Sequence, residues 1–204
     1  MQRNATVIFA ATAALALALG LTANAQDSSS TTTSKPATLA QRRQRQQNRI
    51  ANGINSGQLT AGETQRLERR EAGISRETRD MRQDNGGKLT AADRAKLNRQ
   101  DNRLSRNIYG DKHNAATAHY GNGRIGQRRE NQQDRIAQGI KSGSLTAGET
   151  ARLEGQQRRI NRRTQDMRED NGGHLDRAQR RAVNRQQNRA SRHIYRAKHN
   201  GRRR

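Results

Sequence analysis

Large apolar residues recur every seven positions in two separate parts of the chain. The two series are Leu67, Ile74 and Met81 and, 86 residues later, Leu153, Ile160 and Met167. Seven residues make two turns of an α-helix, so each series lies on one narrow face of a helix. No segment alternates apolar and polar positions as a half-buried strand does. The pattern therefore predicts an all-α protein.

The spacing of 86 residues reflects a duplication. Residues 41–114 and 127–200 align without a gap, and 46 of the 74 aligned positions are identical. Residues 115–126 contain glycine and alanine and separate the two copies as a linker. We therefore expect two tandem three-helix repeats joined by a short linker.

A short motif, repeated inside each copy, marks where helices begin. Its first instance runs from Gly57 through Leu59 and Thr60 to Glu63, and related segments begin at residues 87, 143 and 173. A Thr followed three residues later by an acid forms a capping box. The preceding Gly suits the left-handed conformation that ends a helix. The predicted helices are 40–55, 61–83, 91–109, 126–141, 147–169 and 177–197.

The amino-terminal segment has the parts of a secretory signal peptide. Arg3 precedes an apolar run over residues 7–21, and Ala23 and Ala25 provide the small residues of a cleavage site. Cleavage after Ala25 predicts a periplasmic or secreted protein, and an uncleaved membrane anchor is the alternative. Residues 26–40 are rich in Ser and Thr and are expected to be a disordered tether. Residues 201–204 form a basic tail.

Each copy has few apolar residues from which to build a core. Copy 1 offers large apolar side chains at only 11 of its 74 positions, close to the composition at which chains fail to offset their ordering entropy. The sequence has no cysteine, so no disulfide compensates. We expect each repeat to be marginally stable alone and to be completed by mutual packing or by a bound partner.

The charge balance points to anionic partners. The chain has 41 Lys and Arg against 18 Asp and Glu, a net charge of +23. Copy 1 has 17 basic and 9 acidic residues and a net charge of +8, and copy 2 has 18 basic and 8 acidic residues and a net charge of +10. Arginine outnumbers lysine by 35 to 6. A guanidinium group stays charged and binds phosphate or carboxylate through two parallel hydrogen bonds.

The third helix of each copy is expected to carry arginines opposite its apolar face. The candidate polyanion-binding residues are Arg99, Arg103 and Arg106 in copy 1 and Arg181, Arg185, Arg189, Arg192 and Arg196 in copy 2. Like charges on one helix face repel one another, and a polyanion relieves that repulsion. The alternative is a solvated basic face screened by salt.

Several anionic partners fit this surface. Nucleic acid, anionic lipid and acidic envelope polysaccharide all suit an arginine surface. Beyond residue 25 the only aromatic residues are Tyr109, Tyr120 and Tyr195, which argues against sequence-specific recognition of single strands. We therefore expect an anionic polymer or a membrane surface as partner, with any nucleic acid bound through its backbone. The oligomeric state stays open.

The segments between helices resemble degenerate EF-hand loops. In residues 82–93, Gly87 stands at the turn position, Leu89 at the apolar position and Asp93 at the closing acidic position. The resemblance implies a helix-loop-helix pair and, as an alternative function, a calcium-responsive module. Arg82 occupies the first ligand position and Gln179 replaces the closing acid in copy 2. We therefore expect no metal ligands and no cofactor.

Catalytic signatures are absent from the sequence. It has no nucleophile elbow, no phosphate-binding loop and no zinc-helix motif, and we expect no catalytic residue and no enzyme activity. A structural or chaperone-like envelope stress protein is the remaining alternative.

Overall fold

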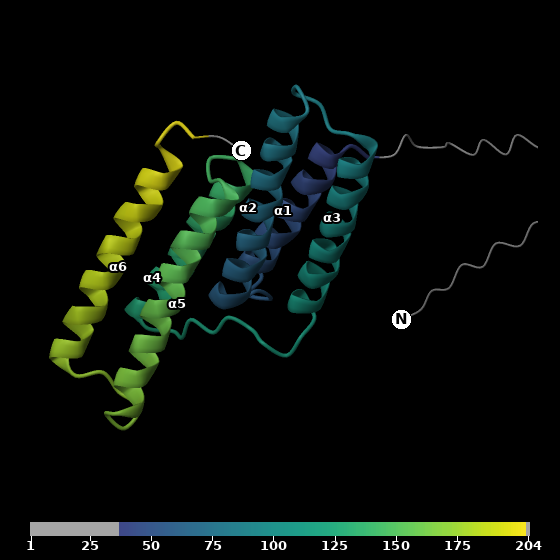
Figure 1. Ribbon diagram of the computed structural model, residues 1–204. Helices are drawn as coiled ribbons and strands as arrows, with labels where there is room; N and C mark the ends of the chain where they lie inside the picture. Colours follow the sequence, from purple (N-terminus) through teal and green to yellow (C-terminus); the bar gives the residue numbers. More distant parts are fainter. Residues whose placement is uncertain (1–36, 203–204) are drawn as a thin grey trace, which may run out of the picture. The chain divides into compact units, whose positions relative to one another are not determined.

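A computed structural model describes residues 37–202. The predicted signal peptide over residues 1–25, residues 26–36 of the predicted tether and the last two residues of the tail lie outside this range. The described residues form six α-helices and no strand, which confirms the all-α class. The helices are α1 (Leu39–Asn55), α2 (Ala61–Asp84), α3 (Ala91–Lys112), α4 (Arg124–Lys141), α5 (Ala147–Glu169) and α6 (Arg177–Lys198) (Figure 1).

Local chemistry explains where these helices begin. The Thr60 hydroxyl accepts a hydrogen bond from the Glu63 backbone N–H at 3.3 Å, and the Glu63 carboxylate accepts one from the Thr60 N–H at 2.9 Å. The same reciprocal pair starts α1, α3, α5 and α6, whereas α4 starts at Gly123 without a side-chain cap. Gly57, which precedes α2, has a φ of 70°, in the left-handed region that favours glycine.

Corresponding helices of the two copies pack against each other. α2 lies against α5 and α1 lies against α4, while α3 packs on α1 and α2, and α6 packs on α4 and α5 (Figure 1). At the α2–α5 contact, a Cβ on Gly155 would lie 2.4 Å from the amide nitrogen of Gln65. The missing side chain at Gly155 therefore leaves room for the Gln65 amide at this contact.

The apolar core runs through both copies. Its largest fully buried members come from five of the six helices and from the residues that precede α2 and α5: Ile50, Ile54, Leu59, Leu67, Leu97, Leu104, Ile108, Ile136, Ile140, Leu145 and Ile194. Mutual packing thus supplies burial that each copy lacks alone. Among the described residues, no helix is both long and apolar enough to cross a bilayer.

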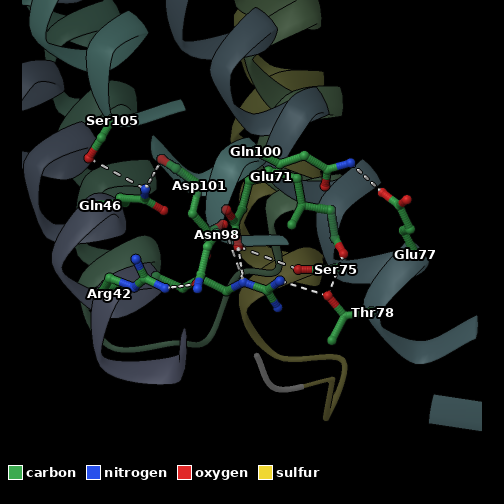
Figure 2. Close-up of polar contacts among 12 residues, drawn as sticks. Arg42, Gln46, Glu71, Ser75, Glu77, Thr78, Asn98, Gln100, Asp101 and Ser105 are labelled. Atoms are coloured by element: carbon green, nitrogen blue, oxygen red, sulfur yellow. Dashed lines mark hydrogen bonds and ion pairs between the residues drawn. The ribbon is translucent and has the colours of Figure 1, made fainter. Parts of the chain in front are cut away.

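Polar side chains complete the interior. The Gln46 amide donates to the backbone oxygen of Asp101 at 2.8 Å (Figure 2). In copy 2, Gln132 makes the equivalent bond to the backbone oxygen of Gln187. Glu154 is fully buried and accepts a hydrogen bond from Gln133 at 3.1 Å. Burial raises the pKa of Glu154 to about 8, although the hydrogen bond from Gln133 opposes the shift.

We predict that Glu154→Gln weakens the pH dependence of folding stability. The folded chain keeps the Glu154 proton up to about pH 8, whereas the unfolded chain loses it near 4.5. The stability that this group contributes is therefore complete below about pH 4.5 and is lost as the pH rises from there to about 8. Urea unfolding at pH 5 and pH 8 should show a smaller difference for the variant. Glu130→Gln, at an exposed position, should keep the wild-type difference; equal pH dependence in all three proteins would contradict the assignment.

Two glycine substitutions should have opposite effects on stability. A Cβ on Gly53 would lie 2.7 Å from Cγ of the buried Leu59, so Gly53→Ala should destabilise by about 1–3 kcal/mol through overpacking. Gly73 is helical with nothing within 4 Å of its Cβ position, so Gly73→Ala should stabilise by about 1 kcal/mol. Urea midpoints that move in the same direction for both variants would show that this packing is wrong.

Candidate anion-binding cleft

The eight arginines predicted from sequence are all exposed on the outer helices. Arg99, Arg103 and Arg106 lie on α3, whose Leu97, Leu104 and Ile108 are buried. On α6 the exposed arginines are Arg181, Arg185, Arg189, Arg192 and Arg196, and the buried residues are Val183, Gln187, Ala190 and Ile194. The two sets lie on helices that pack on different copies.

The structure brings only two of these residues, Arg189 and Arg196, into a common cleft. The cleft has a volume of about 930 Å³ and lies between α2, α5 and α6. Its other arginines are Arg69 and Arg76 from α2, Arg152, Arg159 and Arg163 from α5, and Arg202, which follows α6. Ala151, Leu153 and Ile160 contribute apolar surface to the lining. We call these residues the arginine cleft.

Arginines line the cleft at regular helical spacing. Arg69 and Arg76 are seven residues apart, as are Arg152 and Arg159, and Arg189 and Arg196. Seven residues correspond to two turns, or about 10 Å along the axis, on one face of a helix. Each of the three helices thus presents guanidinium groups to the cleft at matching intervals.

None of the eight cleft arginines forms an ion pair with a carboxylate among the described residues. The guanidinium groups also make no hydrogen bond within this part of the chain, in contrast to Arg43, which donates to the Thr78 hydroxyl at 2.7 Å. Each therefore keeps its donors available to a ligand. A bound anion could engage several of them at once.

Glu149 is the one carboxylate that lines the cleft, and its oxygens are already engaged. Oε2 accepts from the Thr146 N–H at 3.0 Å and hydroxyl at 2.7 Å, and Oε1 accepts from the Asn200 amide at 2.6 Å. Burial opposes ionisation, but these hydrogen bonds, with the charge of Arg152, hold the pKa of Glu149 below its ordinary value. Glu149 thus caps α5 and anchors the segment after α6.

Two acids at the ends of the segments between helices, Glu63 and Asp93, act in helix capping. Glu63 accepts hydrogen bonds from Thr60 and from the Asn114 amide, the latter at 2.7 Å. Asp93 accepts from the Thr90 N–H at 2.9 Å and from the Asn85 amide at 3.0 Å. Within residues 37–202, no three His, Asp or Glu side chains are grouped so that they could hold a metal ion.

Comparisons with known proteins assign no function to the arginine cleft. No protein-family model, curated protein or solved structure matches the chain. The candidate site therefore rests on the chemistry of its own residues.

Sequence reasoning missed six of the eight cleft arginines. The seven-residue spacing of Arg152 and Arg159 was visible, but α2 of one copy could not be placed beside α5 of the other from sequence. Arg129 provides a second example. Its guanidinium carbon lies 5.6 Å from the ring centroid of Tyr120 in the linker. No sequence pattern connects these two residues, so their contact was not predicted.

We predict that the cleft is arranged for binding at some cost in stability. Arg159 and Arg163 are four residues apart on α5 and repel each other, so their joint replacement by Gln should stabilise the fold by about 0.2–0.5 kcal/mol at low salt. The gain should disappear at high salt because the repulsion is screened. Urea unfolding at two ionic strengths measures both effects.

Arg43→Gln is the contrasting variant. Arg43 lies within 3.9 Å of Glu71 and 3.8 Å of Asp101, both buried. Its loss should destabilise by about 3 kcal/mol, because it removes a positive charge that faces two buried carboxylates. If removal of Arg159 and Arg163 destabilises to the same extent, the cleft arginines have a structural role instead.

Proposed function

We propose that the protein is an exported, basic, non-enzymatic helical protein that binds anionic polymers or surfaces by electrostatic attraction. The observation that carries this proposal is the arginine cleft, in which eight guanidinium groups lie together without an ion pair among the described residues. Such a concentration of unneutralised charge attracts anions and raises their local concentration.

Further exposed arginines lie outside the cleft on α6 and on α3. Arg181, Arg185 and Arg192 are exposed on α6, the helix that also supplies Arg189 and Arg196 to the cleft. Arg99, Arg103 and Arg106 are exposed on α3. The proposal assigns all of them to attraction and orientation of the polymer, with nucleic acid recognised, if at all, through its backbone.

The proposed organisation of the chain serves this function. We infer two tandem three-helix repeats over residues 41–114 and 127–200, joined by residues 115–126. Cleavage after Ala25 releases the chain outside the cytoplasm, where residues 201–204 add basic charge. The tether expected over residues 26–40 is shorter than that range, because Thr38 caps α1 and Leu39 and Ala40 belong to this helix. Acidic polymers and anionic lipid head groups of the cell envelope are then the accessible partners.

Retention on heparin, duplex DNA and anionic vesicles across a salt series tests the proposal. Binding should weaken steeply with salt, because each neutralised phosphate releases counterions. Changing Arg185, Arg189 and Arg192 to Gln should reduce the slope of log affinity against log salt on duplex DNA. The expected reduction is about 0.9 for each phosphate that the variant no longer neutralises.

The matched control removes the same charge elsewhere. Arg79, Arg82 and Lys88 are exposed and line no part of the cleft. Their replacement by Gln should change retention less than the α6 triple variant does. Retention that is absent at low salt, or that does not depend on salt, would overturn the proposed function.

A further inference from the structure

The two copies treat their arginines differently. All four ion pairs among the described residues lie in copy 1. Lys96 Nζ is 2.7 Å from Glu77, Arg66 is 3.8 Å from Asp111, and Arg43 lies between Glu71 and Asp101. Figure 2 shows Glu71, Glu77 and Asp101 within the polar cluster formed by α1, α2 and α3. Copy 1 therefore neutralises part of its own basic charge.

Copy 2 lacks every one of these acids. At an offset of 86, Glu71 and Asp101 correspond to Gln157 and Gln187, Glu77 to Arg163, and Asp111 to Ala197. Two of the basic partners persist, since Arg43 corresponds to Arg129 and Arg66 to Arg152. The second copy thus keeps the helices without the internal neutralisation.

Two of the replaced positions line the arginine cleft. Arg163 and Ala197 belong to its lining, and Arg159 and Arg196 stand where copy 1 has glycine. The lining has eight arginines against one carboxylate, a net charge of +7. The 21 positions that correspond to the lining at an offset of 86, its counterpart positions, hold six arginines against three carboxylates, a net charge of +3. The described residues therefore form a strongly basic cleft whose counterpart positions are partly neutralised.

We propose that the arginine cleft is the one strong anion site among residues 37–202 and that its ligand is a flexible, unbranched chain of phosphates without bases, of the inorganic polyphosphate type. This assignment rests on the proposed function, to which it adds the binding site and the class of ligand. The counterpart positions in copy 1 support the fold through their ion pairs and contribute little to binding.

The spacing of the arginines favours an extended ligand. Arg152 and Arg163 are eleven residues apart, which places them about 16 Å apart along α5. Arg69 and Arg76 approach from α2, and Arg189 and Arg196 approach from α6. A narrow chain with closely spaced charges can contact arginines of all three helices along this length. A bilayer presents its charges in a plane and does not follow a cleft.

The lining also favours a ligand without bases. No Tyr, Phe or Trp lines the cleft, and its one aromatic ring, that of His193, pairs with Gln156 at 2.9 Å. Single-stranded nucleic acid binds strongly where bases stack on aromatic rings. Tyr195 is 58% exposed on α6, but it stacks on His199 outside the cleft lining.

The test introduces the missing acids. In the full chain, Arg163→Glu with Ala197→Asp gives copy 2 the residues of copy 1 and lowers the net charge by three. Arg79→Glu with Ala95→Asp lowers it by the same amount at exposed positions outside the cleft. Calorimetry with inorganic polyphosphate should give one strong site per chain. The first variant should lose at least about tenfold in affinity, because a carboxylate beside a bound anion is repelled, and the second should lose much less.

A milder variant guards against misfolding. Arg159→Gln with Arg196→Gln introduces no new acid and should also weaken polyphosphate binding, while its helical circular dichroism stays that of the wild type. Arg79→Gln with Arg82→Gln removes the same charge outside the cleft and is the control. If both double variants lose the same affinity for polyphosphate, the cleft is not the binding site.

The possible outcomes separate this inference from the proposed function. Equal losses of affinity in the two variants that lower the net charge by three would show that polyphosphate is attracted by the whole basic surface. That result overturns the single site and leaves polyanion binding intact. Tighter binding of an oligothymidine of matched charge, or of anionic vesicles, would overturn the phosphate-chain ligand. If polyphosphate, oligothymidine and vesicles fail to bind at low salt, and heparin and duplex DNA fail as well, the proposed function itself fails.

Discussion

Packing between the two copies is the interaction on which the rest of the structure depends. Large apolar side chains are too few in either copy to enclose a core alone, and α1–α4 and α2–α5 contacts supply the missing burial. Buried Gln, Thr and Glu side chains fill the remaining space and have to find hydrogen-bond partners there. Gly155 shows how tight this junction is, because Gln65 occupies the place of its side chain.

The shared core also sets where charge can accumulate. Inner helices must face each other across the junction, so most of the variable arginine positions fall on outer faces or at the edges of the α2–α5 contact. Copy 1 offsets such charge with Glu77 and Asp111, and copy 2 has Arg163 and Ala197 in the same places. Both copies form the same three helices with these different residues. The helices therefore form with either set of residues at these edges.

Local chemistry made the helices predictable, and distant contacts made the site unpredictable. Thr60 with Glu63 and Asp176 with Gln179 begin helices where the sequence indicated. The predicted start of α4 was two residues too late, because Gly123 has no capping side chain that would reveal the helix start in the sequence. The amphipathic pattern identified Arg189 and Arg196. It could not identify Arg69 or Arg76 as their neighbours, because that requires knowing which helix of the other copy lies alongside.

The bond from Asn200 to Glu149 has a consequence for motion. Helix α6 packs on α4 and α5 from the outside, and Asn200 ties the segment that follows it to the first turn of α5. We expect α6, an outer helix outside the α1–α4 and α2–α5 contacts, to unfold locally before the junction between the copies opens. A ligand that bridges α2, α5 and α6 would close that route. Occupancy of the cleft should then register as slower amide hydrogen exchange along α6, even where no backbone group contacts the anion.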